Sequence, residues 1–562
     1  MVWSNPIFRR YCRSRLRPTT LGLGLLIVLI LAGFIFFMAR TLGSLRSDFD
    51  PVDVARFPLI PLLVLQGLIL FFIGTGQTAG GMTTEADEGT LDYQRLAPMT
   101  PLAKVLGYLF GLPVREYVLF LATLPFTAWS LWRGEVPAHV AAQLYGVFLS
   151  SAILYHLTGL VAGTVVRNRR FAFLISIGTV ILLYTVVPQM ANFGLVYFRY
   201  LTIRPVIEEC LPHLIPRDAG AGVATLQSLV KQARFFDLGL PEYAFTLLCQ
   251  GVFALTMVVM LWRRWRRAES HLLGKAWATG LYAWIQVLLL GNALPLIEPG
   301  HLFISRTMAR RFFQFRESAD WSPAPTEAVA MASAYGIVSL IFIWVLSLMI
   351  TPNAENQTRG WRRARKLGRR SLAPASDPAT AFWWVLAMAL VGAAGWYLFA
   401  SALIGSRWFP GREMPAMAAP AFVLAFLTGG LCFHALLEGR GAKATVLTVI
   451  FIGVVPVFVG TVVGTAADRL IAPATWLVGL SPASGPAYAS TLTLPTSDLP
   501  PEFARAAPRA FWFWQGIAAL ATAALVAHLR RSRIAAALAA NDSTPRSAGD
   551  KHPAPPDPHP QA

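Results

Sequence analysis

Apolar stretches of about 20 residues recur along the whole 562-residue chain, and they constrain its fold more than any other feature. Each stretch is long enough to cross a bilayer core of roughly 30 Å as a helix. Because a backbone in lipid must satisfy its own hydrogen bonds, such runs form helices there. The alternating pattern of a membrane barrel, with its polar inner face, is not visible. The sequence therefore predicts an all-α polytopic membrane protein.

The apolar stretches predict about twelve transmembrane helices, and the order of long and short links repeats after the sixth. The first six are expected at about 21–39, 57–74, 106–130, 139–166, 171–192 and 240–262. The last six are expected at about 277–297, 329–350, 381–405, 417–437, 444–466 and 511–529. We therefore expect two tandem six-helix modules, at 21–268 and 269–533. Parallel repeats of this kind are a known transporter architecture.

The charges indicate how the chain sits in a membrane. Only 14% of the residues are charged, yet the formal net charge is +19. The positive charges cluster beside the apolar runs, as the positive-inside rule requires. These clusters are Arg9 to Arg17, Arg167 to Arg170, Arg263 to Arg267, Arg359 to Arg370 and Arg530 to Arg533. We expect both termini in the cytosol, contact with membrane lipids, and no nucleic-acid partner.

One segment conflicts with this topology. Residues 306–316 are basic, yet they would lie outside if 277–297 crosses the membrane. Residues 277–297 contain Pro295 and could instead form a re-entrant hairpin. A crossing helix is favoured because it keeps the other basic links inside.

The two ends of the chain are expected to differ from the spans. Residues 1–20 read as a basic interfacial helix, whose apolar residues could face lipid while its arginines face headgroups. Those apolar residues are Ile7, Phe8, Tyr11 and Leu16. A plain positive-inside anchor is the alternative. Residues 534–562 contain alanine, proline and aspartate and are expected to be a disordered cytosolic tail.

A polar stretch, EADEGTLDYQRLAPMTPLAKVLG at 85–107, lies between the second and third apolar runs. We expect residues 75–104 to be a loop holding a short helix that Thr83 or Thr84 caps. Pro98 and Pro101 would end that helix before the next span. A short rigid helix there could transmit the movement of a docked subunit, although an ordinary solvated loop is the alternative.

This stretch resembles the cytoplasmic coupling loop of type-2 ATP-binding-cassette (ABC) exporter permeases. In that family the loop reads roughly E-x-E-x-G-T-L-E, then T-P and a G-K that opens the next helix. The matching residues are Glu85, Asp87, Gly89, Thr90, Leu91, Asp92, Pro98, Thr100 and Gly107, with Glu88 beside them. Tyr108 departs from the pattern, because the family usually has lysine there. The first residues also resemble the family's opening interfacial helix, at Asn5, Pro6, Ile7, Arg9 and Arg10.

The resemblance implies the membrane-spanning permease subunit of an ABC exporter in the bacterial inner (plasma) membrane. The sequence contains no Walker A pattern for cradling phosphates. ATP and Mg²⁺ would therefore belong to a separate, dimeric ATPase subunit, and this chain would carry no catalytic residue, cofactor or metal. The corresponding loop of the second module, 351–370, is basic and lacks a clear copy of the motif. That difference favours the alternative, a membrane scaffold or assembly factor without transport of its own.

Four ionisable residues inside the apolar runs are further candidates, because such residues are costly in lipid and often functional. They are Arg115, Glu116, His156 and His434. Adjacent side chains on one helix point in different directions, so Arg115 and Glu116 are not expected to pair with each other. A structural role, through hydrogen bonds between helices, is the alternative for each.

The topology can be tested with reporter fusions at residues 170, 268 and 440. All three should report a cytosolic location, because each follows a basic link. An external signal at residue 268 would overturn the assignment of the two modules.

Overall fold

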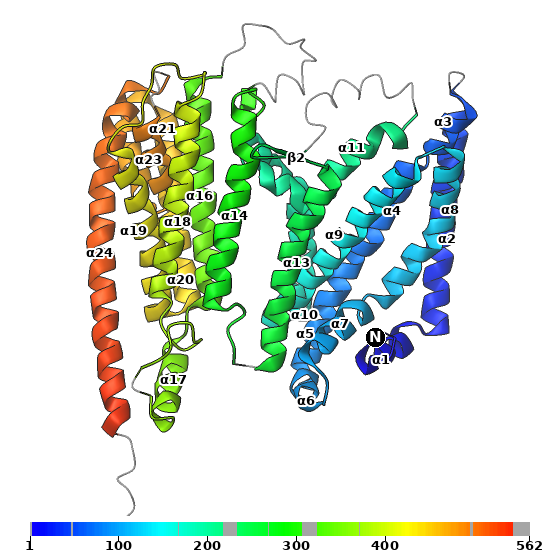
Figure 1. Ribbon diagram of the computed structural model, residues 1–562, viewed down its shortest axis with the longest axis horizontal. Helices are drawn as coiled ribbons and strands as arrows, with labels where there is room; N and C mark the ends of the chain where they lie inside the picture. Colours follow the sequence, from blue (N-terminus) through cyan, green and yellow to red (C-terminus); the bar gives the residue numbers. More distant parts are fainter. Residues whose placement is uncertain are drawn as a thin grey trace, which may run out of the picture.

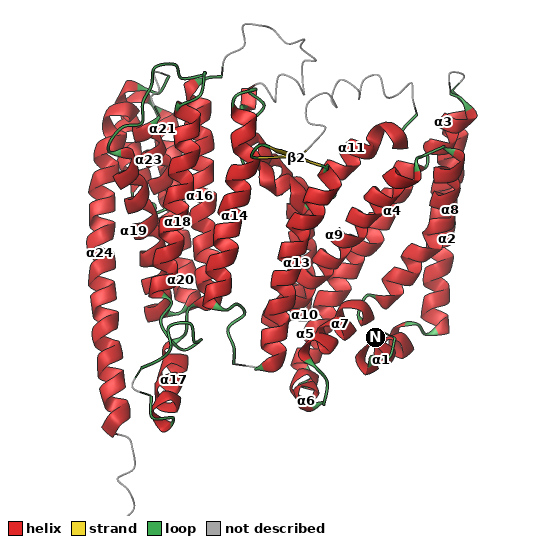
Figure 2. Ribbon diagram, in the orientation of Figure 1, coloured by secondary structure: helices red, strands yellow, loops and turns green. Residues whose placement is uncertain are grey.

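Long helices run side by side through the whole molecule (Figures 1 and 2). The computed structural model describes residues 3–46, 49–166, 168–216, 233–267, 269–305, 323–369, 371–494 and 498–542. Within these ranges eleven helices are long and apolar enough to cross a membrane, or twelve if one bent pair counts as a single span. The predicted all-α polytopic fold is confirmed, and every predicted membrane helix falls on one of these spans.

The N-terminal half lies on the right of Figure 1. Its first spans are α2 (Pro18–Ser44) and a continuous run of α3 (Pro51–Arg56), α4 (Leu59–Gly67), the π-helical η1 (Leu68–Gly74) and α5 (Thr75–Asp87). The bent pair α7 (Pro101–Gly111) and α8 (Val114–Arg133) follows, with an angle of 51° between them. The remaining spans are α9 (Ala138–Val165), α10 (Arg169–Thr185) and α13 (Glu242–Arg266).

The C-terminal half lies on the left of Figure 1. Its spans are α14 (Lys275–Ile297), α16 (Pro325–Ile350), α18 (Phe382–Ile404) and α19 (Ala418–Arg440), then α20 (Ala442–Val449) with π-helical η5 (Ile450–Val454) and α21 (Val455–Ala466), and finally α24 (Pro501–Asp542). Because α14 is one continuous helix with Pro295 in its last turn, it has the length of a crossing span. Residues 306–316 lie outside the described residues.

Short elements occupy both ends of the spans. At the upper end of Figure 1 the N-terminal half has η2 (Val187–Phe193), η3 (Val196–Leu201), α11 (Arg204–Leu214), and strands β1 (Ala233–Phe235) and β2 (Leu238–Leu240), which pair antiparallel. The C-terminal half has η6 (Asp468–Leu470), α22 (Ile471–Gly479) and α23 (Ser484–Thr493) between α21 and α24. At the lower end lie α1 (Pro6–Arg15), α6 (Thr90–Leu96), α17 (Ala354–Lys366) and the C-terminal end of α24. We call this lower end the α6 end.

Two sequence-based boundaries need correction. The second span does not end near residue 74: helix continues through α5 to Asp87, so residues 75–87 of the predicted loop are helical. Their composition is poor for a helix, but α5 packs along α9 and α10, and tertiary packing overrides propensity. The predicted disordered tail also begins in helix, because α24 runs to Asp542 through an alanine-rich stretch of high helix propensity. Residues 543–562 lie outside the described residues.

The contact between α5 and α9 depends on two glycines four residues apart. A Cβ atom at Gly159 would lie 2.8 Å from the Thr75 carbonyl oxygen. A Cβ atom at Gly163 would lie 2.7 Å from the Ala79 carbonyl oxygen. This is the small-residue spacing that lets membrane helices approach backbone to backbone.

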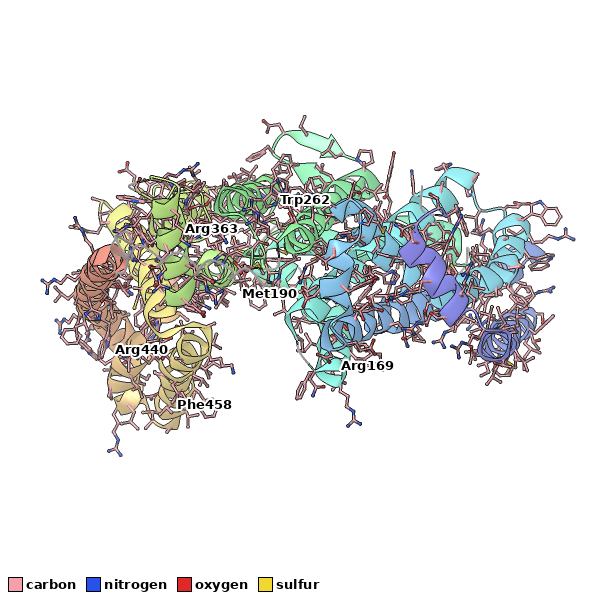
Figure 3. All side chains as sticks on the ribbon, turned by 90° about the horizontal axis from the view of Figure 1, so that it is seen from below. Arg169, Met190, Trp262, Arg363, Arg440 and Phe458 are labelled. Atoms are coloured by element: carbon pink, nitrogen blue, oxygen red, sulfur yellow. The ribbon has the colours of Figure 1, made fainter. Side chains whose placement is uncertain are left out.

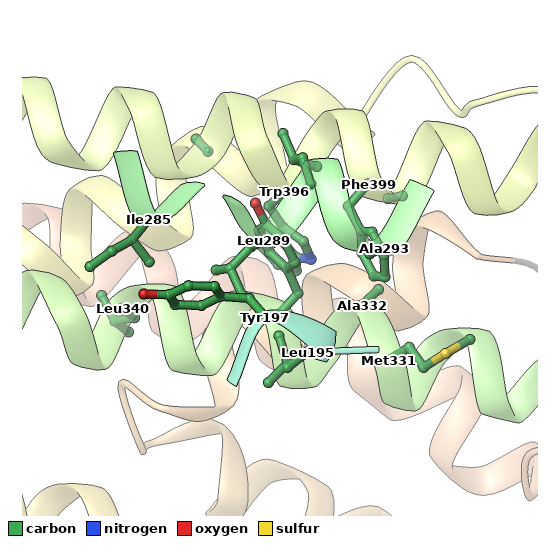
Figure 4. Close-up of a cluster of buried hydrophobic side chains, with 14 of the residues drawn as sticks. Leu195, Tyr197, Ile285, Leu289, Ala293, Met331, Ala332, Leu340, Trp396 and Phe399 are labelled. Atoms are coloured by element: carbon green, nitrogen blue, oxygen red, sulfur yellow. The ribbon is translucent and has the colours of Figure 1, made fainter. Parts of the chain in front are cut away.

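One apolar core joins the two halves (Figure 4). Leu195 and Tyr197, from the first half, lie among Ile285 and Leu289 of α14 and Met331 of α16. All five are buried. The segment between α10 and α13 therefore serves as packing for the second half.

The helices of the two halves pair in a similar order. In the first half α2 packs on α8, α5 on α9, and α9 on α13. In the second half α14 packs on α18, α16 on α19, and α19 on α24. The division at residue 268 into two modules stays a prediction.

Gly163→Ala should destabilise the protein by about 1–3 kcal/mol, because the new methyl group must push α5 away from α9. Thermal unfolding of the detergent-purified protein measures this. The matched control is Gly146→Ala on the same helix, where a Cβ would meet open space. That substitution should be neutral or stabilising by up to about 1 kcal/mol. Equal stability of the two variants would contradict the close packing of α5 and α9.

Candidate functional site

The short helix α6 protrudes beyond the spans between α5 and α7 (Figure 1). Gly89 separates α5 from α6 with φ at +70°, a left-handed conformation that glycine adopts without strain. A Cβ atom at position 89 would lie in open space. The positive φ, and not a lack of room for a side chain, therefore explains the glycine. The expectation that Thr83 or Thr84 caps the short helix is wrong. Both residues lie within α5, where their hydroxyls donate to the Ala79 and Gly80 carbonyl oxygens.

The two faces of α6 differ. Leu91 is buried in a core with residues of α1, α5, α7, α9 and α13. The opposite face is exposed, with Tyr93 77% and Leu96 83% accessible. Exposed acidic side chains lie in the same segment: Asp87 ends α5, Glu88 follows it, and Asp92, which pairs with Arg95, lies in α6. We call the exposed set the α6 ridge: Asp87, Glu88, Asp92, Tyr93 and Leu96. Thr90 lies half-buried at the start of α6, and Pro98 is exposed just beyond its end.

Glu85 does not belong to this exposed ridge. Its carboxylate lies in a buried cluster, where Oε1 accepts a hydrogen bond of 2.7 Å from the Tyr11 hydroxyl and forms an ion pair with Arg10. Oε2 accepts from the Tyr108 hydroxyl at 3.3 Å. Burial, together with the Glu85 carboxylate, raises the pKa of Tyr11, so this hydroxyl stays protonated and donates. The structure thus brings together the two groups predicted separately, the N-terminal helix and the coupling loop.

The N-terminal helix α1 is fixed against α7. Asn5 caps α1 by accepting from the Ile7 amide at 3.0 Å, and its own amide donates to the Ala103 carbonyl at 2.6 Å. Pro6 occupies the first helical position, where its missing N–H costs nothing. Arg9 is exposed and donates to the Trp3 carbonyl.

The apolar face of α1 packs on protein, which corrects the expectation that it faces lipid. Ile7, Phe8 and Tyr11 are all buried, and Leu16, the fourth residue expected to face lipid, is half-buried just after α1. Gly107 and Gly111 make room for α1 on the surface of α7. A Cβ at Gly107 would lie 2.9 Å from the Ile7 Cβ atom, and one at Gly111 would lie 2.9 Å from the Tyr11 ring.

Further aromatic contacts extend the cluster to α13. Tyr108 stacks on Trp265, with ring centroids 5.3 Å apart and an interplanar angle of 19°. Lys104 lies over the Trp265 ring at 5.8 Å and donates to the Ala97 carbonyl just after α6. Sequence reasoning missed Lys104 and Trp265 in this cluster, and also Tyr93 and Leu96 on the exposed face of α6. The available signal was Tyr108 itself, which departs from the pattern of the loop that this stretch resembles and which here donates to Glu85.

Arg115 and Glu116 form an ion pair with each other, so the expectation that they do not pair is wrong. Arg115 Nη2 lies 2.8 Å from Glu116 Oε1, and Nε lies 3.1 Å away. Both belong to the first turn of α8, directly after the break at Pro113. The long Arg115 side chain reaches across this turn to the buried Glu116 carboxylate. The usual directions of neighbouring side chains on a helix do not predict this contact.

The two histidines connect helices. His156 is buried, with Nδ1 2.9 Å from the Tyr117 hydroxyl and Nε2 2.9 Å from the Leu70 carbonyl oxygen in the π-helical turn η1. His434 Nδ1 lies 3.1 Å from the Thr351 hydroxyl just after α16. Its Nε2 lies 3.3 Å from Glu438 on the same helix, and the Glu438 carboxylate also meets Arg533 of α24. These contacts fit hydrogen bonding between helices, the structural alternative for both residues.

Scanning the chain against protein families, curated proteins and solved structures gives no match. The site must therefore be interpreted from its own geometry. That geometry is an exposed helix with an apolar centre and acidic rim, joined through a buried polar cluster to α1, α5, α7 and α13.

Glu85→Leu should destabilise the α6 end by about 1–3 kcal/mol, because the buried tyrosine hydroxyls lose their charged acceptor. Thermal unfolding and the protease sensitivity of residues 3–16 measure the effect. The matched control is Asp92→Leu, which breaks only the exposed ion pair with Arg95 and should cost about 0.2–1 kcal/mol. Equal losses in the two variants would show that the Glu85 cluster does not hold α1.

Proposed function

We propose that this chain is the membrane-spanning permease subunit of an ABC exporter, driven by a separate ATPase that docks on the α6 ridge. The observation that carries the proposal is the ridge itself. Exposed tyrosine and leucine side chains surrounded by charge are typical of protein interfaces, where aromatic residues dominate the binding energy. The acidic rim would meet a basic surface of the ATPase.

The α6 end would face the cytosol of a bacterial cell, with the spans in the inner membrane. Its basic residues support this orientation under the positive-inside rule. In Figure 3, which looks at the molecule from this end, Arg169 belongs to one half and Arg363 and Arg440 to the other. An ATPase that binds cytosolic ATP would reach α6 from this side.

The packing beneath α6 gives a route from docking to movement of the spans. Leu91 fixes α6 to the shared core, and Lys104 ties the end of α6 to α7. Glu85 links α5 to α1 and α7, and the Tyr108–Trp265 stack extends the link to α13. A subunit that displaced α6 would therefore displace several spans together, since packed elements move as units.

A scaffold or assembly factor without transport is the second candidate. The basic helix α17 favours it, because α17 differs in charge from α6 although both follow the second span of a predicted module. A scaffold could bind a partner at α6 without stimulating ATP hydrolysis. The two candidates thus differ in the response of the bound partner to transport substrates.

The purified chain alone should hydrolyse no ATP and should co-purify with a nucleotide-binding subunit. Tyr93→Ala/Leu96→Ala should reduce the retained ATPase by about tenfold or more, because the apolar centre of the ridge is lost. Quantitative immunoblotting or mass spectrometry of the affinity-purified complex measures the retention. Charge reversal at Asp87, Glu88 and Asp92 should have the same direction of effect, with Glu85 left intact because it is buried.

The matched control is Trp132→Ala, which removes an aromatic side chain of 73% exposure at the opposite end of the spans. It should leave both retention and unfolding temperature unchanged. If both α6 variants retained the ATPase, the docking proposal would be overturned, and α6 would be an ordinary solvated segment. A bound ATPase whose activity never responds to candidate substrates in vesicles would favour the scaffold.

A further inference from the structure

Helix α17 occupies the place in the second half that α6 occupies in the first. It follows α16, the second span of its half, and precedes α18, as α6 follows α5 and precedes α7. Both helices lie at the same end of the spans, and α17 extends below the ends of α16 and α18 beside α24 (Figure 1). Position alone therefore makes α17 a second candidate for docking.

The surface of α17 has the opposite charge to the α6 ridge. Its packing face contains the buried residues Gln357 and Ala364, with Gly360 against Pro378. Its other face is exposed and basic at helical spacing, in a helix with five basic residues and one acidic residue. The exposed basic residues are Arg359, Arg362, Arg363 and Lys366. Arg359 pairs with Glu355 on the same helix, so we define the basic face of α17 by the other three.

Helix α17 and the loop that follows it contact both halves. Gln357 donates to Glu438 of α19. The loop after α17 carries Asp377, which forms an ion pair of 2.7 Å with Arg263 at the end of α13. Lys275, the first residue of α14, donates to the Ala379 carbonyl at 2.6 Å. A partner bound to α17 would thus act on the junction where the two halves of the chain meet.

We propose that α17 is a second docking helix, and that its partner is an acidic protein surface of a nucleotide-binding subunit different from the one at α6. The inference rests on the proposed function. Two copies of one subunit would present the same patch to both helices, because copies related by a two-fold axis expose identical surfaces. One patch cannot complement an acidic ridge and a basic face, since like charges at an interface disfavour binding. The driving ATPase is therefore a heterodimer.

Photo-crosslinking from the intact complex tests this assignment. Benzoylphenylalanine replaces Tyr93 in one preparation and Arg362 in another, and the crosslinked peptides are identified by mass spectrometry. We expect the two positions to capture different polypeptides, with a basic segment at Tyr93 and an acidic segment at Arg362. Capture of the same peptide from both positions would overturn the heterodimer while leaving the proposed function intact. Capture of lipid alone from Arg362 would overturn docking at α17.

Charge reversal gives an independent readout. Arg362→Glu/Arg363→Glu/Lys366→Glu should reduce the subunit captured at α17 by about tenfold or more relative to the subunit captured at α6. The matched control is Arg440→Glu/Lys443→Glu, which reverses exposed charges at the same end of the spans but outside α17. It should leave both subunits bound. Equal loss from the α17 variant and the control would overturn the inference, whereas a chain that retains no nucleotide-binding subunit in its unaltered form would overturn the proposed function itself.

Discussion

The Glu85 carboxylate is the interaction on which the α6 end depends. A buried carboxylate is tolerated only when charge and hydrogen-bond donors compensate for its lost hydration. Arg10 and Tyr11 supply these from α1, and Tyr108 supplies a third donor from α7. Because these donors belong to α1 and α7, the Glu85 carboxylate at the end of α5 holds these three helices together. The exposed helix α6 begins at Thr90, shortly after this cluster.

The sequence predicted this fold well because lipid imposes a simple rule. Apolar runs of sufficient length must become helices, and each predicted run corresponds to an observed span. The prediction was weaker wherever a helix is stabilised by its neighbours. The run from Thr75 to Asp87 contains three glycines and several threonines, so its hydropathy suggested a loop. Packing against the glycine face of α9 holds it helical, and that contact is not visible in a local window of sequence.

The candidate site was predictable in part for the same reason. The polar segment between two apolar runs stood out, and its acidic residues were listed from the sequence, but the exposed Tyr93 and Leu96 were not. The sequence did not show that Glu85 is buried whereas Asp87 and Glu88 are exposed, because these residues lie within one helical turn of each other. Pairing between Arg115 and Glu116 was missed because a proline break precedes them and ordinary helix geometry was assumed. Polar contacts between distant helices, such as Arg10 with Glu85, need the tertiary fold.

The two halves share an order of spans but differ in how the fifth span packs. In the first half α10 lies along α5, so the second and fifth spans are in contact. In the second half α23 packs against α16, while α21 packs along α22. In the second half, a short helix between the fifth and sixth spans therefore packs against the second span. The charges at the α6 end differ in the same way, acidic on α6 and basic on α17. Because the two halves differ both in span packing and in exposed charge, they do not present matching surfaces to two identical partners, which agrees with the asymmetry that we propose for the docked subunits.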